Sequence, residues 1–233
     1  MINFGALNIN SMAVGQKQVN EAYVGSNKIW PTTQAEVYIP KSYLYFDGTT
    51  GINTGIDQLG NPSVFIDFQN TAFTNVQFYM PFGVRVGTGT NDSFLIVANY
   101  TSSRYIFQYG ATMTAYTIGT LAVNTNRRTI SIVNKVATMT VLANGNTANV
   151  TASAAAPVNA GNIWLGCAAN SDGPIAGSMH VGNIYSFTIQ KNNVYVLNMT
   201  PVQKQSTGEY GMLDSVSGNF FGNATGQGTI TGG

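Results

Sequence analysis

The residues most able to perform covalent chemistry are a single histidine, His180, and a single cysteine, Cys167. Nucleophilic catalysis needs a nucleophile next to a base, with a third group that orients the base. Any Ser–His or Cys–His arrangement therefore depends on His180. That residue lies just before a predicted strand, and Cys167 lies in an apolar run, so a structural role is favoured for both. A single cysteine also excludes an intramolecular disulfide.

Acidic and metal-binding residues give no clear site either. One Cys and one His cannot fill a zinc site, and the 9 acidic residues are scattered along the sequence. Asp172 could contribute to a calcium-binding loop, but a turn-capping role is favoured. Glu209 and Asp214 lie in a glycine-rich tail, where a structural role is favoured over a glycosidase pair. The sequence leaves open the possibility of a carboxylate pair formed by residues that are distant in sequence. We expect no catalytic, cofactor-binding or metal-binding residue, and no enzymatic activity.

The low charge limits the classes of partner. Only 8% of the 233 residues are charged and the net charge is +1, whereas roughly 25% charged residues are usual. A neutral polar surface does not attract nucleic acid or anionic lipid, and Arg127-Arg128 is the only adjacent basic pair. No apolar run approaches the ~18 residues of a membrane span, and no signal peptide is expected. Such a surface suits packing against copies or partners in an assembly.

Four segments alternate between two faces with a period of two residues. The alternation and the choice of Val, Ile, Thr, Tyr and Phe predict half-buried antiparallel strands. Turn sequences such as Asp47-Gly48 and Asn192-Asn193 separate them, which predicts an all-β sandwich or barrel. The residues expected to share a face within each segment are Val64, Ile66 and Phe68; Tyr105, Phe107 and Tyr109; Ile130 and Ile132; and Tyr185, Phe187 and Ile189.

The chain is expected to have two parts. Residues 1–34 read as a small β appendage with three short strands, followed by a sandwich domain over residues 35–233. An element this short cannot stabilise itself and must dock on the main domain, a symmetry mate or a larger particle. The residues proposed for docking or oligomerisation are Tyr23, Val24, Ile29 and Trp30.

Tyrosines are the candidates for sugar binding, because an exposed aromatic ring can stack on the apolar C–H face of a pyranose. The alternative is that most of them lie in the core or in cross-strand pairs. The tyrosines considered are Tyr43 and Tyr45, and the candidate glycan contacts are Tyr100, Tyr105, Tyr109 and Tyr116.

Several segments resemble the concanavalin A-like (laminin-G-like) domains of tailed-phage structural proteins. Residues 43–56 read YLYFDGTTGINTGI, like the family's aromatic strand, turn and "I-x-T-G-I/V". Residues 182–189 and 194–202 resemble its "G-x-I-Y-S" and "D-F-x-P-V" strands. Residues 208–223, GEYGMLDSVSGNFFGN, resemble "G-x-x-G-L-Y-D-x-V-x-G-K-F-Y-x-N". The resemblance spans about residues 38–231 and implies an all-β fold that is a two-sheet antiparallel sandwich of the jelly-roll type. It departs at Asn144, where the family has an Asp-Gly turn, which argues against family-type calcium or sugar binding.

Residues 18–30 resemble a short element that precedes such domains in gut-phage virion proteins. Together the resemblances imply a non-enzymatic virion structural protein of a tailed phage, exposed as a head fibre, capsid decoration or tail accessory. It would act by assembly with other virion proteins and by multivalent display, as a homo-oligomer for which we expect a trimer. The alternative is a glycan-binding adhesin that recognises host surface polysaccharide or mucin. A glycan-cleaving enzyme is a third and less favoured hypothesis.

Overall fold

The computed structural model describes residues 36–73, 78–86, 92–99, 101–112, 114–170 and 173–233 (176–178 as backbone only), and the backbone of four short strands before them. The chain divides into two units, Met1–Val37 and Tyr38–Gly233. In the first unit, β1 (Ala13–Val14) pairs with β2 (Lys17–Gln18), and β3 (Ala22–Val24) pairs with β4 (Asn27–Trp30). The side chains of Tyr23, Val24, Ile29 and Trp30 lie outside the described residues, so their docking role stays a prediction.

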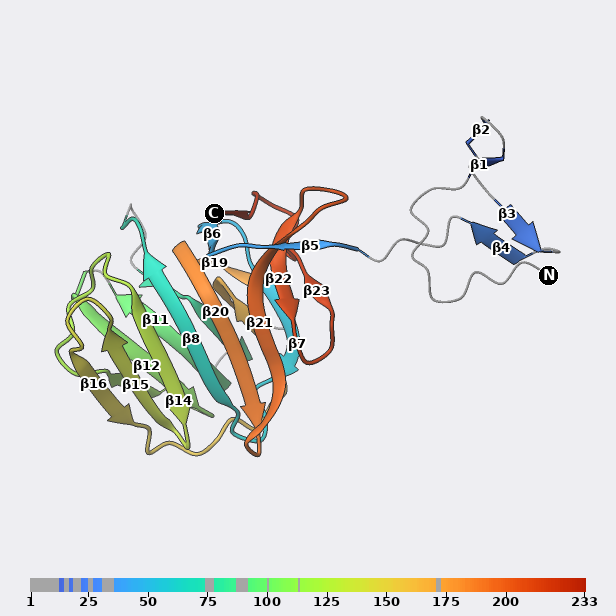
Figure 1. Ribbon diagram of the computed structural model, residues 1–233. Coiled ribbons are helices and arrows are strands. Elements are labelled where there is room, and N and C mark those ends of the chain that lie inside the picture. The colour runs from blue at the N-terminus through green and yellow to red at the C-terminus, as the bar shows by residue number, and fades with distance from the viewer. Residues whose placement is uncertain are drawn as a thin grey trace. The chain divides into compact units, whose positions relative to one another are not determined.

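The larger sheet of the second unit has β8 near its centre. Val64, Ile66 and Phe68 of this strand are buried, while Phe65 and Asp67 face the other way and are half-buried, which confirms the predicted alternation. Eleven strands form this sheet (Figure 1). The main path runs β16 (Thr147–Thr151), β15 (Val136–Val141), β14 (Arg128–Val133), β8 (Ser63–Asn70), β20 (Val181–Lys191), β21 (Val194–Lys204), β22 (Tyr210–Asp214) and β23 (Phe220–Phe221), with β5 (Tyr38–Pro40) on β21, β6 (Leu44–Asp47) on β20 and β24 (Thr231–Gly232) on β6.

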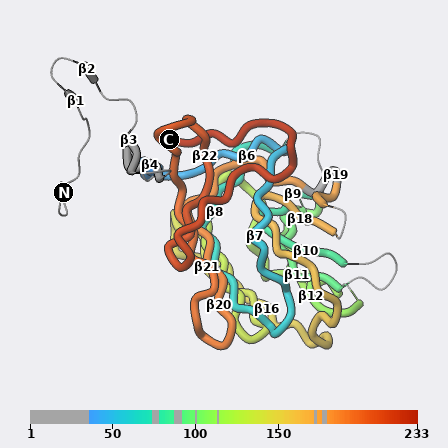
Figure 2. Tube along the Cα trace, turned by 90° about the vertical axis from the view of Figure 1, so that its right-hand side faces the viewer, coloured from blue at the N-terminus to red at the C-terminus, as the bar shows by residue number. Residues whose placement is uncertain are grey.

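The second sheet has nine strands and packs face to face with the first, as the edge-on view in Figure 2 shows. All of its pairs are antiparallel except one, between β10 and β18. Its path runs β13 (Thr114–Thr117), β12 (Arg104–Gly110), β11 (Asp92–Asn99), β10 (Phe82–Val86), β17 (Asn162–Leu165) and β7 (Ile52–Asp57), with β9 (Phe78–Tyr79) on β11, β18 (Cys167–Asn170) on β10 and β19 (Gly173–Met179) on β18. None of the described residues is helical. The predicted all-β, two-sheet jelly-roll sandwich is confirmed.

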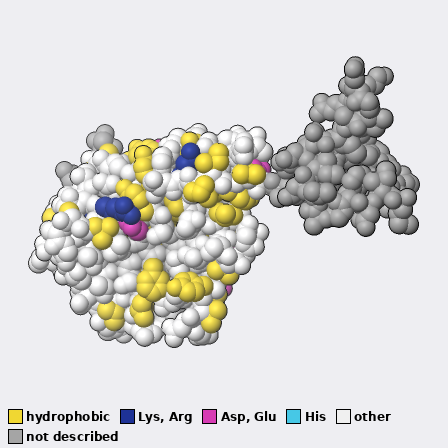
Figure 3. Space-filling model, in the orientation of Figure 1, with side chains coloured by type: hydrophobic (Ala, Val, Ile, Leu, Met, Phe, Trp, Pro, Cys, Tyr) yellow, Lys and Arg dark blue, Asp and Glu magenta, His cyan; other side chains and the backbone are white. Residues whose placement is uncertain are grey.

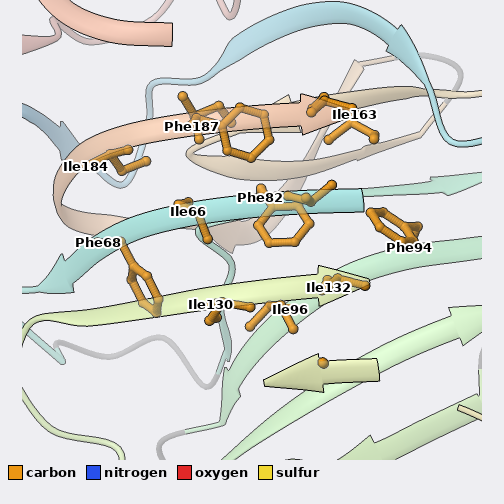
Figure 4. Close-up of a cluster of buried hydrophobic side chains, with 14 of the residues drawn as sticks. Ile66, Phe68, Phe82, Phe94, Ile96, Ile130, Ile132, Ile163, Ile184 and Phe187 are labelled. Carbon is orange, nitrogen blue, oxygen red and sulfur yellow. The ribbon is translucent and has the colours of Figure 1, made fainter. Parts of the chain in front are cut away.

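Aromatic and branched side chains from both sheets fill the space between them (Figure 4). Phe187 of the first sheet contacts Phe82 of the second, with ring centroids 5.7 Å apart, and Phe82 contacts Phe94 at 6.1 Å. All three rings are at most 1% exposed. Burying such a side chain stabilises the fold by about 1.5–3 kcal/mol. The core therefore holds the sheets together and leaves the outer face of the larger sheet free to be polar.

A β-bulge interrupts the alternation in β20. Ile184 pairs with Phe68 and Ser186 pairs with Asp67, so Tyr185 is an extra residue on its strand. A bulge of this kind turns two consecutive side chains to one face. Tyr185 and Ser186 are both half-buried, whereas Ile184 and Phe187 are fully buried. The prediction that Tyr185 shares a face with Phe187 is therefore wrong, because a period of two cannot anticipate an inserted residue.

Candidate functional site

A shallow hollow lies on the outer face of the larger sheet, the face turned toward the viewer in Figures 1 and 3. Its volume is about 300 Å³, at the lower end of the ~300–1,000 Å³ range of ligand pockets. Figure 3 shows that this face is mostly uncharged, with one place where basic and acidic side chains lie together. The residues that line the hollow are Phe65, Ile66, Asp67, Thr129, Ile130, Ser131, Thr138, Thr140 and Ser186.

The strand register arranges the outward side chains of the hollow in two rows across four strands. The first row runs from Thr140 through Thr129 and Asp67 to Ser186. The second runs from Thr138 through Ser131 to Phe65, and the next residue in that row, Thr188, lies outside the lining. Adjacent strands lie about 4.8 Å apart, so neighbours within a row are separated by about that distance. Hydroxyl groups therefore recur at short intervals around one aromatic side chain and one carboxylate.

The chemistry of the hollow suits a polyhydroxylated ligand. Each Ser or Thr hydroxyl can donate one hydrogen bond and accept others, and the Asp67 carboxylate can only accept. Phe65 supplies the apolar ring face among these groups. Sugars present this same combination of hydroxyls and an apolar C–H face.

Arg127 and Tyr185 fix the position of Asp67. The Arg127 guanidinium binds the carboxylate through two hydrogen bonds, from Nε to Oδ1 at 2.8 Å and from Nη2 to Oδ2 at 2.6 Å. Those bonds raise the pKa of Arg127 further above its usual value. The Arg127 Cζ lies 3.5 Å from the centroid of the Tyr185 ring, and the Tyr185 hydroxyl donates to Gln69 Oε1 at 2.8 Å. The only carboxylate of the hollow is thus already paired with a cation.

No family model matches this sequence, and no curated protein matches it. One solved structure that it resembles is the mouse laminin alpha1 chain, domains LG4-5. The two are 12% identical with a TM-score of 0.45, over 71% of this chain and 42% of that chain. The chain therefore spans less than half the length of that structure.

Of the tyrosines predicted as glycan contacts, two lie in the core. Tyr105 and Tyr109 are both 0% exposed, and burial raises the pKa of each to about 12. Their prediction as glycan contacts is wrong because β12 directs them into the core. The Tyr116 hydroxyl accepts hydrogen bonds from the backbone N–H groups of Ser153 and Ala154, at 3.1 and 2.8 Å, and so braces a loop. Tyr100 lies outside the described residues.

Tyr43 and Tyr45, which the sequence also suggested, are half-buried on the same outer face as the hollow. Tyr45 pairs across the strands with Asn183, and the Tyr43 ring lies 5.9 Å from the Tyr185 ring. Neither residue lines the hollow. They continue its polar and aromatic surface beyond Tyr185.

His180 and Cys167 are both completely buried. The His180 ring packs between Phe46 and Phe68, at centroid distances of 6.4 and 5.9 Å. No hydrogen bond joins either ring nitrogen to the described residues, and burial lowers the pKa of His180 to about 4. Burial also raises the pKa of the Cys167 thiol to about 12. Both residues are placed as core side chains, away from the hollow.

The acidic candidates that the structure describes, Asp214 and Glu209, make structural contacts. The Asp214 carboxylate accepts hydrogen bonds from the backbone of Asn198, Val216 and Ser217, and Glu209 pairs with Lys204 at 2.8 Å. Within the described ranges, no group of three or more His, Cys, Asp or Glu side chains is placed to hold a metal ion. Asp172 lies outside these ranges. Nor does the described part of the chain contain a helix long and apolar enough to cross a bilayer.

The lining of the hollow was not identified from the sequence. Several of its residues are outward positions of segments that the sequence predicts to alternate, for example Thr129 and Ser131 opposite Ile130 and Ile132. An alternating pattern shows that such positions exist, but it does not show which strands are neighbours or how they are aligned. The signal that could have found them is the repeated Thr/Ser at alternate outward positions in residues 129–131 and 138–140.

Proposed function

We propose that the sandwich unit is a non-enzymatic glycan-binding module and that it is displayed on the surface of a tailed-phage particle. The observation that carries the binding function is the hydroxyl-lined hollow around Phe65 and Asp67. Its open shape suits contact with a surface polysaccharide rather than enclosure of a small molecule.

The preferred ligand is an uncharged glycan. Asp67 is the only charged side chain in the lining, and Arg127 neutralises it through two hydrogen bonds. An anionic sugar would bring its charge next to the Asp67 carboxylate and would have to compete with it for Arg127. A neutral hexose instead needs only hydroxyl partners and an aromatic face.

The particle context rests on the sequence. The resemblance over residues 38–231 is to domains of phage structural proteins, and the low charge of 8% suits a protein that packs with others in an assembly. On a particle, many copies would multiply the weak binding of each hollow. The protein would then serve as a head fibre, capsid decoration or tail accessory that adheres to host polysaccharide or mucin.

The binding function is tested by applying the purified full chain to an array of neutral and acidic bacterial and mucin-type glycans. We expect binding to neutral polysaccharides, and weaker binding to matched polymers that carry uronic or sialic acid. No binding to any glycan would contradict the proposed function. Equal or stronger binding to the acidic polymers would contradict only its preference for neutral ligands.

The particle context needs a separate test. The protein should be detected by mass spectrometry at a fixed ratio to the capsid protein in purified phage particles. A chain lacking residues 1–34 should remain folded but should not be incorporated. Absence of the full chain from particles, or normal incorporation of the shortened chain, would contradict this part of the proposal without affecting glycan binding.

A further inference from the structure

The strand β16 ends the larger sheet and leaves one edge of its backbone without a partner among the described residues (Figure 1). Its five residues pair with β15 in an unbroken antiparallel register, from Val136–Thr151 to Thr140–Thr147. The chain then turns away, because the Tyr116 hydroxyl on the other sheet binds the backbone N–H groups of Ser153 and Ala154. The edge is therefore regular and is not covered by the segment that follows it.

The hydrogen bonds of the hairpin show which backbone groups of β16 point outward. Val141 N–H donates to the Asn146 carbonyl, and Ala152 N–H donates to the Lys135 carbonyl. In an antiparallel pair, hydrogen-bonded and non-hydrogen-bonded positions alternate. Ala148 and Val150 therefore bond to β15. The N–H and C=O groups of Thr147, Asn149 and Thr151 point to the free edge.

This edge lacks the features by which sheet edges usually avoid pairing. Protective features are Lys or other charged residues, proline, bulges and covering loops. The sequence has no charged residue from Val136 through Ser171, and β16 contains no proline and shows no shift of register. The nearby Lys135 directs its ammonium group to the carbonyl of Ala154, at 3.2 Å.

We propose that β16 pairs antiparallel with β16 of a second copy of this chain, about a two-fold axis at Asn149, which gives a dimer in place of the trimer expected from the sequence. Asn149 then faces its own copy, and Thr147 faces Thr151 of the other chain. All three outward positions are of the hydrogen-bonding type, so each facing pair can exchange two backbone hydrogen bonds. A two-fold contact brings each residue close to its own kind, and an uncharged edge makes that possible without repulsion.

The pairing would join the two larger sheets into one continuous sheet. The two-fold axis that relates the two antiparallel strands is perpendicular to the sheet. The outer faces of both copies would therefore point to the same side. The two hollows would then face the same surface, which favours bivalent binding. The pairing itself does not depend on glycan binding, since it uses only the backbone of β16.

The substitution Asn149→Pro tests this contact directly. The N–H group that proline removes points to the free edge, so no hydrogen bond of the β15–β16 hairpin is lost, but the partner strand loses its central donor and meets the proline ring. Asn149→Ala is the matched control, because it removes the same side chain and keeps the N–H. A second variant, Asn149→Lys, keeps the backbone intact and places like charges at the axis.

The measurement is the mass of the full chain in solution by light scattering and sedimentation equilibrium. We expect the wild type and Asn149→Ala to have twice the chain mass of 24.8 kDa, and Asn149→Pro to have the single-chain mass. Asn149→Lys should weaken association at least about tenfold, with an unchanged circular dichroism spectrum. A monomeric wild type, a trimer, or a mass that neither Asn149→Pro nor Asn149→Lys changes would overturn the proposal.

Discussion

The guanidinium carbon of Arg127 lies 3.5 Å from the centre of the Tyr185 ring, while two of its nitrogens bind Asp67. The relationship depends on the bulge that turns Tyr185 outward next to Ser186. One arginine thus links the aromatic part of the outer face to the only carboxylate of the hollow.

Replacing Arg127 by lysine should lower the affinity for glycan while leaving the stability of the fold nearly unchanged. Lysine can neither form the paired hydrogen bonds nor stack in the same way. We therefore expect glycan affinity to fall several-fold. The free energy of unfolding should change by less than ~1 kcal/mol, because the Arg127 side chain is 43% exposed. Arg104→Lys, an exposed change on the second sheet, is the control. Titration calorimetry and urea denaturation measure both quantities, and unchanged affinity in Arg127→Lys would contradict its positioning role.

Acid should destabilise the protein through His180. Its pKa is about 4 in the folded state and about 6.5 in an unfolded chain. Between these values the unfolded state binds more protons, so stability falls as the pH falls from about 6.5 to about 4, by roughly 3 kcal/mol in total. His180→Leu should remove this part of the pH dependence in urea denaturation curves. A variant with the same slope as the wild type across this window would contradict the assignment.

Gly182 should not tolerate a side chain. Its φ is +150°, and a Cβ atom there would lie 2.0 Å from the Gln69 carbonyl oxygen and 2.9 Å from the Asn70 Cα, both backbone atoms of the neighbouring strand. Gly182→Ala must therefore separate β20 from β8, and we expect a loss of at least about 3 kcal/mol of stability. Gly145→Ala is the matched control: its φ is +72° with no atom within 4 Å of the added Cβ, so only about 1 kcal/mol should be lost. Equal thermal denaturation midpoints in the two variants would refute the argument.

Asp214 should stabilise the hairpin between β22 and β23. Burial acts to raise its pKa, but hydrogen bonds from Ser217, Asn198 and Val216 bring it below the usual value. Asp214→Asn would place an amide N–H₂ against backbone donors, and we expect a loss of about 2 kcal/mol in the free energy of unfolding. The contribution of the carboxylate should be fully present above about 4, the pKa of an unfolded Asp, and should be lost only as the pH falls from there through the lowered pKa of the folded state, below most of the His180 window. Asp57→Asn, at a partly exposed ion pair with Lys191, should cost less than ~1 kcal/mol.

The strands themselves were predictable because one buried face imposes a period of two on each of them. In residues 64–69 the alternation separates the core from the surface completely. The same regularity explains why the prediction of Tyr105 and Tyr109 as glycan contacts is wrong. The alternation that placed Tyr105 and Tyr109 with Phe107 also implies that all three rings are in the core, and this implication outweighs their suitability for sugar binding.

The candidate site was not predictable to the same degree. Phe65 and Asp67 come from one strand, but their neighbours Ser131 and Ser186 lie far away in sequence and meet them only through the register of β14 and β20. The Tyr185 bulge is set by pairing with β8 rather than by local sequence. Long-range alignment of strands, and not residue type, forms the hollow.

The most direct test of the account is the affinity of the full chain for a neutral polysaccharide identified on the array, measured by titration calorimetry for Phe65→Ser and Tyr195→Ser. Both changes replace an aromatic residue by serine, but Tyr195 is an exposed residue of β21 that does not line the hollow. The account predicts about a tenfold loss of affinity for Phe65→Ser, which corresponds to ~1.4 kcal/mol for the lost ring contact, and no loss for Tyr195→Ser. Wild-type affinity in Phe65→Ser, or an equal loss in both variants, would contradict it.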